Sequence, residues 1–300
     1  MPELPEVTTT VKGLNEVLPN LTIKDVWTDY FVGTTSKQNE SLKNEKYFEI
    51  FKKEVVGHKF KNVDRKGKYI LIHLSKNKTI LVHMKMTGHF LYGKYFFENN
   101  KWKSNDKYLN DPFNGFVRFL LKLSNGKSLA FSDMRKFATV RLFETDKINQ
   151  SVHLKDIGPE PLENLDLNTL KKQLLKKPGL KIKTALMDQK ILAGIGNIYS
   201  DEILWQSNIH PEKKVFDLDN KDFKNILSSM VKILNKSISM GGDSMSDYRN
   251  IYGQKGGFQE AHKVYRKTKT ICSKKGCRGT IKRIIVGGRS THFCDKHQKM

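Results

Sequence analysis

The sequence predicts an α+β, multidomain protein, with a β-rich first half, a helical second half and a small cysteine-bearing tail. Three observations support this fold class. Apolar residues alternate with polar ones, as in strands, through much of the first 150 residues, and they recur at helical spacing afterwards. All three cysteines fall in the last 30 residues. At 300 residues and 38% apolar content, the chain can bury more than one core.

The first half begins with a predicted helix, because apolar residues recur at helical spacing at Val7, Val11, Leu14 and Leu18. We expect this helix to start near Pro5. Residues 68–74 and 79–86 alternate as two strands around a polar turn. A second hairpin turns at Asn125-Gly126, between a strand over 117–123 and one through Leu129 and Phe131. Residues 98–115 are polar and predict a surface loop.

The second half is predicted to be helical over 167–175, 182–187 and 198–205. A further helix is indicated by an apolar stripe at Phe223, Ile226, Leu227, Met230, Val231 and Leu234. From about residue 265 the tail predicts a short Lys/Arg-rich hairpin around the cysteines.

The charge balance favours a polyanionic partner. The chain carries 54 Lys and Arg against 31 Asp and Glu, a formal net charge of +23 that is spread along the sequence. Nucleic acid is the leading candidate, and a Lys-rich, well-solvated surface explains only part of the excess. No apolar run is long enough to cross a bilayer, and the first residues are acidic where a secretory signal would be basic. We therefore expect an intracellular protein.

The cysteines predict one structural Zn²⁺, because an odd, clustered set of thiols in a reducing compartment argues against disulfides. Cys272-x4-Cys277 and Cys294-x2-His297 flank a strand–turn–strand stretch with Gly287-Gly288 at its tip. Ligand pairs at the two ends of a hairpin can close a tetrahedral site. His292 is a rival fourth ligand with poorer spacing to Cys294, and unrelated buried thiols are the alternative. Three cations on the hairpin suit phosphate contact: Lys282, Arg283 and Arg289.

Two further segments carry potential chemistry. The 194–197 turn would let backbone N–H groups and the Asn197 amide approach a phosphate at a helix start, although such glycines are as often plain helix–helix geometry. If Met1 is removed, Pro2 presents an α-amine that titrates at about pH 8 and can form a Schiff base with a sugar C1′. Glu3 and Glu6 lie beside it as possible proton carriers. The alternative is a helix cap without chemistry.

Short motifs occur in order at 1–7, 65–69, 83–88, 133–137, 158–162, 194–199 and 288–294. Together they resemble the formamidopyrimidine-DNA glycosylase / endonuclease VIII family, and more closely its formamidopyrimidine-DNA glycosylase branch. The resemblance implies an N-terminal β-sandwich with an N-terminal helix over 1–150, a helix-two-turns-helix domain with a lesion-capping loop over 151–262, and a zinc-finger β-hairpin over 263–300. DNA would lie in the cleft between the domains.

By position, the resemblance makes Pro2 the Schiff-base nucleophile and Glu3 the carboxylate that assists sugar-ring opening. Lys68 would hold a phosphate beside the lesion, and Asn197 and Arg289 would clamp the same backbone. Such contacts offset the free energy needed to extrude a base from the stack. His83 and Tyr248 are further DNA-contacting candidates, and Glu6 is a further acidic candidate.

Met86, Arg135 and Phe137 match the family's residues that fill the space left by the extruded base. The Arg135 guanidinium suits the acceptors of an orphaned cytosine, whereas adenine would face it with a donor. Met86 and Phe137 have the alternative reading of buried strand residues. The segment from 246 to 265, which includes Tyr248, resembles a full-length lesion-capping loop. It favours oxidised purines and should be mobile until DNA binds.

We therefore predict a base-excision-repair enzyme, a bifunctional DNA glycosylase and AP lyase. It would remove 8-oxoguanine and formamidopyrimidines opposite cytosine through a Pro2 Schiff base with β,δ-elimination. We expect a monomer acting on double-stranded DNA with oxidised bases or abasic sites, in a bacterial cytoplasm or nucleoid, a nucleus or a viral factory. The alternatives are an endonuclease VIII-like glycosylase for oxidised pyrimidines and a non-catalytic zinc-dependent protein that binds damaged DNA.

Four features depart from the family pattern. His297 replaces the usual last cysteine, which zinc tolerates, and Met134 and Ala138 replace a proline and a glycine beside the void-filling residues. The segments 30–55 and 98–115 are longer than usual, and the sequence assigns them no role.

Overall fold

The computed structural model describes residues 1–31, 41–163, 165–245 and 247–300. Residues 32–40 of the long segment 30–55, and Ser246 of the predicted capping loop, therefore lie outside the described residues. The chain forms two compact units, Met1–Lys155 with Gly241–Gly257, and Asp156–Met240 with Phe258–Met300. The division into three domains stays a prediction, and the structure groups residues 241–257 with the β-rich unit.

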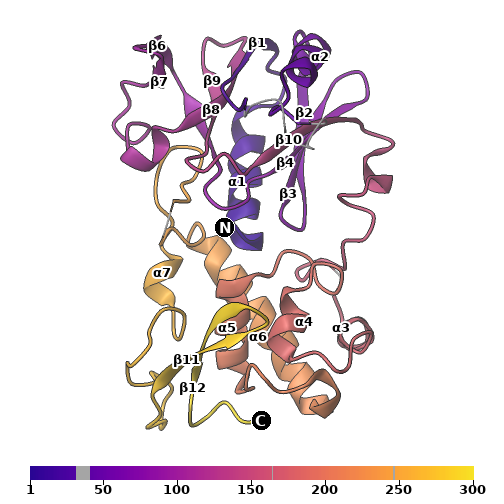
Figure 1. The fold of residues 1–300 in the computed structure, drawn as a ribbon, viewed down its shortest axis with the longest axis vertical. Coiled ribbons are helices and arrows are strands. Elements are labelled where there is room, and N and C mark those ends of the chain that lie inside the picture. The colour runs from indigo at the N-terminus through magenta and orange to yellow at the C-terminus, as the bar shows by residue number, and fades with distance from the viewer. Residues whose placement is uncertain (32–40, 164, 246) are drawn as a thin grey trace. The chain divides into compact units, whose positions relative to one another are not determined.

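The first unit is an antiparallel β-sandwich with helices (Figure 1). One sheet has the strand order β1-β8-β9-β5 and the other β10-β4-β3-β2. Apolar side chains from both sheets pack with Leu14 of α1 in a shared core that includes Ile72, Val82, Phe119 and Phe131. The elements are α1 (Leu4–Val17), β1 (Ile23–Thr28), α2 (Glu45–Val55), β2 (Phe60–Lys66), β3 (Tyr69–Leu74), β4 (Lys78–His83), β5 (His89–Gly93), β6 (Phe96–Glu98), β7 (Lys101–Lys103), η1 (Pro112–Asn114), β8 (Val117–Leu123), β9 (Ser128–Ser132), β10 (Thr139–Glu144) and η2 (Ile148–Gln150).

The N-terminal helix and both predicted hairpins are confirmed. Helix α1 begins at Leu4, β3 pairs with β4, and β8 pairs with β9. The sequence analysis did not identify the short strands β1, β2, β5 and β10. It also overlooked α2, whose buried residues Phe48, Phe51 and Val55 recur at helical spacing.

The prediction of a surface loop over 98–115 is confirmed only in part: most of the segment is exposed and irregular, but it also contains a strand and buried residues. Lys101–Lys103 forms β7, which pairs with β6, and Leu109 packs in a small core with Leu91 and Leu120. The polar residues of this segment satisfy its own backbone, since the Asp106 carboxylate accepts from the Tyr108 N–H at 2.8 Å. Its polar side chains therefore bond the segment internally, although most of its residues are exposed.

The second unit is built around α5 (Figure 1), a helix buried on nearly all sides. Helix α5 packs against α4, α6 and the hairpin strand β12. The elements are α3 (Leu167–Leu174), α4 (Ile182–Met187), α5 (Asn197–Ser207), η3 (Val215–Asp217), α6 (Asn220–Ser239), α7 (Phe258–Ala261), β11 (Ile281–Val286) and β12 (Arg289–Cys294). The predicted helices and the cysteine-bearing hairpin are confirmed. Among the described residues, no helix is both long and apolar enough to span a membrane.

Candidate active site and metal centre

The N-terminus is fixed by the start of α1. Pro2 is buried and precedes Glu3, which occupies the N-cap position in an extended conformation. Glu3 and Glu6 form a capping box, in which the Glu3 N–H donates to Glu6 Oε2 at 2.8 Å. The capping box provides acceptors for backbone N–H groups at the helix start that have no partner within the helix. It also holds Pro2 beside the buried carboxylate of Glu3. Met1 itself is exposed.

Glu6 also holds a second segment. Its Oε1 accepts from the Asp243 N–H at 2.7 Å, so both carboxylate oxygens accept backbone hydrogen bonds. Gly242 lies against this carboxylate with φ of +82°, and a Cβ there would be 3.0 Å from Glu6 Oε1. These contacts suit Glu6 to holding the 241–243 turn, whereas its predicted proton-carrier role stays a prediction.

Lys68 and His83 lie on neighbouring ends of β3 and β4. Gly67, with φ of +57°, makes the two-residue turn from which Lys68 enters β3, and the Lys68 side chain is largely buried. Tyr69 pairs with His83 in the register, with their rings edge to face and centroids 4.7 Å apart. His83 Nδ1 accepts from the Lys85 N–H at 3.0 Å. Burial, with help from Lys85 and Lys68, lowers the pKa of His83 to about 3.

The three predicted void-filling residues stand on two exposed turns. Met86 is 41% exposed and Phe137 is 48% exposed, so neither is the buried strand residue of the alternative reading. The Arg135 guanidinium carbon lies 4.4 Å from the centroid of the Phe137 ring, a cation–π contact. Apolar and cationic surface is thus presented to solvent beside a well-packed core. The role of these residues on DNA stays a prediction.

A buried carboxylate that the sequence analysis missed joins these two turns. Asp133 is fully buried and accepts from the Thr87 hydroxyl at 2.5 Å and from the Ala138 N–H at 2.9 Å. Thr87 Oγ1 in turn accepts from the Arg135 N–H at 3.2 Å. The Tyr30 hydroxyl donates to Asp133 at 2.9 Å, and burial beside this carboxylate raises the pKa of Tyr30. The sequence signals were its place in the 133–137 motif and its position directly after an apolar strand, and neither indicated this role.

Tyr248 is internal in this structure. Its side chain is buried, and its hydroxyl donates to the Glu6 carbonyl at 3.0 Å and lies 3.3 Å from Thr10 Oγ1. The phenol therefore packs against α1 and presents almost no surface to DNA. A direct DNA contact by Tyr248 stays a prediction, and the packing gives the residue a structural role that the sequence analysis did not foresee.

In the second unit, Asn197 opens α5 after the glycine turn. The Gln189 side chain fixes this turn, because its Oε1 accepts from the Gly194 N–H at 2.9 Å and its Nε2 donates to the Ile195 carbonyl at 2.8 Å. Among the described residues, Asn197 Oδ1 is enclosed and makes no hydrogen bond. The amide is thus placed at a helix start, where backbone donors favour anions.

Arg289 is exposed at the start of β12, opposite Val286 across the hairpin turn. The hairpin is tied to α5 three residues further on. Asp201 is fully buried, accepts from the His292 N–H at 2.9 Å and from His292 Nδ1 at 3.0 Å, and pairs with the buried Lys183 of α4. This arrangement explains why His292 is not a metal ligand in this structure and how the register of Arg289 is fixed.

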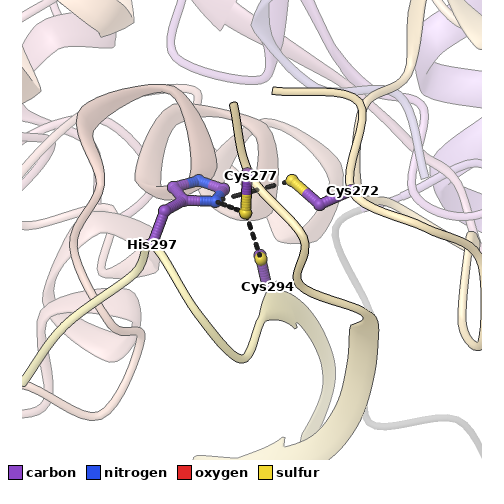
Figure 2. Close-up of side chains that lie close together, drawn as sticks. All are labelled: Cys272, Cys277, Cys294 and His297. Atoms are coloured by element: carbon purple, nitrogen blue, oxygen red, sulfur yellow. Dashed lines mark hydrogen bonds between the residues drawn. The ribbon is translucent and has the colours of Figure 1, made fainter. Parts of the chain in front are cut away.

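The four predicted zinc ligands converge at the base of the hairpin (Figure 2). Their ligand atoms all lie within 4.8 Å of one another, with His297 Nδ1 3.5 Å from Cys272 Sγ and 3.6 Å from Cys277 Sγ. Cys277 Sγ and Cys294 Sγ are also 3.6 Å apart. A tetrahedral zinc with Zn–S bonds of about 2.3 Å separates its ligands by roughly 3.5–3.8 Å. The residues therefore fit a closed, structural zinc site.

The surroundings of this site orient its ligands. His297 Nε2 lies 3.2 Å from the Trp205 carbonyl, which leaves Nδ1 facing the cysteines. The Trp205 indole N–H donates to Cys272 Sγ at 3.4 Å, and its ring meets that of His297 edge to face. A side chain at Gly279 would overlap Cys294 Sγ. This packing confirms His297, and not His292, as the fourth member of the cluster.

Comparisons with known proteins agree along the whole chain. Residues 1–140 match the Formamidopyrimidine-DNA glycosylase N-terminal domain, and residues 157–249 match the Formamidopyrimidine-DNA glycosylase H2TH domain. Proteins named formamidopyrimidine-DNA glycosylase from Ligilactobacillus salivarius and Desulforamulus reducens are similar. The first is 35% identical over 99% of both chains, and the second is 33% identical over 100% of this chain and 99% of the other.

Solved structures with a similar fold contain DNA. A mutant Lactococcus lactis Fpg bound to DNA with a Fapy-dG lesion has a TM-score of 0.83 and 31% identity over 100% of both chains. Lactococcus lactis Fpg bound to abasic-site DNA has a TM-score of 0.82 and 31% identity, covering 99% of this chain and 100% of the other. A MutM complex with carbocyclic 8-oxo-G DNA has a TM-score of 0.82 and 32% identity over 100% of both chains.

Proposed function

The chain belongs to the formamidopyrimidine-DNA glycosylase family, and from this premise we propose that it excises oxidised purines from duplex DNA and then cuts the strand. The family makes it a DNA-repair glycosylase that binds DNA. The finer proposal is that 8-oxoguanine and formamidopyrimidines opposite cytosine are its substrates. It acts as a monomer, in the compartment that holds the DNA.

The proposed chemistry begins once Met1 is removed. The secondary amine of Pro2 attacks C1′ of the damaged nucleotide, the glycosidic bond breaks, and the base leaves with a proton. Glu3, buried beside Pro2, protonates O4′ as the sugar ring opens to a Schiff base. β-Elimination then removes a C2′ proton and breaks the C3′–O3′ bond, and δ-elimination removes the C4′ proton and breaks the C5′–O5′ bond. Lys68 is proposed to hold a phosphate beside the damaged nucleotide.

One observation carries the proposal most strongly. Met86, Arg135 and Phe137 are exposed on two turns, and the buried Asp133 carboxylate accepts a hydrogen bond from each turn, through Thr87 and Ala138. Two apolar side chains and a guanidinium held on a rigid support are suited to enter an unstacked duplex step. The guanidinium of Arg135 carries donors only, which suits an orphaned cytosine and disfavours adenine.

The test is borohydride trapping on duplexes with one central lesion. Wild-type enzyme should give a covalent complex with 8-oxoguanine opposite cytosine, a weaker one opposite adenine, and strand cleavage without borohydride. A matched protein whose N-terminus is extended, so that Pro2 stays in a peptide bond, should trap nothing. Trapping by the extended protein would refute the Pro2 assignment. Preference for a thymine-glycol duplex would refute the purine assignment, and binding without trapping would refute catalysis.

The Cys272, Cys277, Cys294 and His297 cluster is proposed to hold zinc that folds the hairpin and takes no part in the reaction. Gly279→Ala should abolish stoichiometric zinc, because the new methyl group would overlap Cys294 Sγ. Gly179→Ala is the control in the same unit, because a Cβ there meets no atom within 4 Å and the backbone φ is not positive. Metal analysis of the two purified variants decides the point, and full zinc content in Gly279→Ala would contradict it.

A further inference from the structure

A fully buried arginine lies in the segment predicted to cap the lesion. Arg249 is 1% exposed, and its Nη1 donates to the Tyr248 carbonyl at 2.9 Å. Its Nη2 lies 3.5 Å from Asp111 Oδ1, and its guanidinium carbon is 4.8 Å from the centroid of the Phe113 ring. A buried cation is costly unless a carboxylate and other partners compensate it. Two of the groups that contact Arg249, Asp111 and Phe113, belong to the long segment of unassigned role.

The same part of the chain holds the segment at a second point. Asn114 is buried, and its Nδ2 donates to the Tyr108 carbonyl at 2.7 Å and to the Gly253 carbonyl at 3.3 Å. Gly253 has φ of +78°, and a Cβ there would lie 2.5 Å from the Tyr108 carbonyl oxygen. The backbone at 253 thus fits closely against residues 108–114. We call residues 104–115 the brace.

The brace is internally fixed, so it can hold another segment in place. Asp106 accepts from the Tyr108 N–H, and Asp111 accepts from the Phe113 N–H at 2.9 Å while it faces Arg249. Leu109 anchors the brace in a small apolar core. These contacts order the brace without any help from the segment it holds.

The brace also reaches the turn that carries Met86. Asn114 Oδ1 lies 2.8 Å from His89 Nε2, and because both Asn114 amide hydrogens are directed at carbonyls, the imidazole is the donor. His89 begins β5, directly after the turn at 85–88, and further along β5 the Tyr92 N–H donates to the Ile251 carbonyl at 2.7 Å. One buried amide therefore connects the base of the Met86 turn with the 248–253 backbone.

We propose that the brace, through Asp111 and Asn114, is a positioning device that orders the 247–257 segment before DNA binds, with Arg249 as its main anchor, in place of the mobility that the sequence predicted for these residues. This inference rests on the proposed function, in which that segment covers the damaged base. A pre-ordered cap lowers the entropic cost of holding the base during its expulsion. It has no such task once the base is gone, so the brace should matter for base removal and not for cutting an abasic site.

The test compares two reactions of the same protein under single-turnover conditions. Asp111→Asn keeps the shape of the side chain but removes the anion that faces Arg249. We expect 8-oxoguanine excision to slow by about tenfold or more, as when one charge-assisted contact is lost. Cleavage at a preformed abasic site should stay within about twofold of wild type. Amide hydrogen exchange over 247–257 should speed up in the free protein.

Two further variants keep the outcome interpretable. Glu98→Gln removes the exposed ion pair with Lys103 on the neighbouring β6–β7 hairpin and should change none of the three readouts. Arg249→Met combined with Asp111→Asn removes both charges of this pair, so this double variant should fold and still excise slowly.

Equal losses in excision and abasic-site cleavage would reduce the brace to a general stabilising role and overturn the inference. Unchanged excision in Asp111→Asn, or unchanged exchange over 247–257, would overturn it as well. A wild-type protein inactive on both substrates would instead refute the proposed function. In that case the exchange data would still decide whether the brace orders the segment.

Discussion

Asp201 offers the sharpest test of how the second unit presents its hairpin. Replacement by alanine leaves Lys183 fully buried without its carboxylate and removes the acceptor of two His292 donors. Breaking a buried pair by deleting one partner costs about 3–5 kcal/mol. With an m value of about 2 kcal/mol/M, the urea midpoint of the second unit should fall by roughly 2 M. DNA affinity should fall too, because Arg289 lies three residues from His292 on β12.

The assay is urea unfolding followed by Trp205 fluorescence in a Trp27→Phe/Trp102→Phe background, so that the signal comes from the second unit. Lys183→Met/Asp201→Leu removes both charges and should recover most of the lost free energy, since apolar replacement of a whole buried pair is often neutral. Lys190→Ala breaks an exposed pair with Asp156 and should cost less than about 1 kcal/mol. A change below 1 kcal/mol in Asp201→Ala, or a double variant as unstable as the single one, would refute the reasoning.

Three further predictions concern the first unit. Gly242→Ala should destabilise the protein by about 1–2 kcal/mol more than Gly57→Ala, because both glycines have positive φ but only the first lies against Glu6; equal thermal shifts would contradict this. Met86→Ala should change stability by less than about 0.5 kcal/mol and weaken lesion binding, whereas Met84→Ala, in the core, should cost about 2–5 kcal/mol in urea unfolding. Burial depresses the pKa of His83 to about 3 in the folded protein. The unfolded chain therefore takes up a proton on His83 at a higher pH than the folded chain does. The resulting stabilisation is complete above about pH 6.5 and is lost as the pH falls toward 3. His83→Asn should therefore remove about 2 kcal/mol of the difference in unfolding free energy between pH 7 and pH 5, and an unchanged pH slope would exclude His83 as its source.

Features that depend on neighbours in the sequence were predictable. The stripe of α1, the Asn125-Gly126 turn and the spacing of Cys272, Cys277, Cys294 and His297 each encode a local geometry, and the structure confirms all three. His297 could be preferred over His292 by spacing alone. The sequence could not show that His292 is bonded to Asp201, because that contact joins residues 91 positions apart.

Features that depend on distant partners were missed. The polar composition of 98–115 predicted a loop, yet Asn114 is buried because its partners, His89 and Gly253, come from two other parts of the chain. By its local sequence Asp133 is likewise an ordinary turn residue. Its buried role depends on the Thr87 hydroxyl and the Tyr30 phenol, which donate hydrogen bonds to it from distant parts of the chain. Tyr248 was expected at a DNA surface, and its internal position follows from a contact with α1 that no local pattern encodes.

The placement of Trp205 gives the metal centre a spectroscopic consequence. The chain has three tryptophans, and the other two, Trp27 and Trp102, meet edge to face in the first unit with ring centroids 5.8 Å apart. Trp205 alone touches the ligand cluster, through its indole N–H to Cys272 and its edge contact with His297. Loss of the proposed zinc would change the polarity and the fluorescence quenching around the Trp205 indole. Emission from a Trp27→Phe/Trp102→Phe protein should thus follow chelator titration in real time, without any added dye.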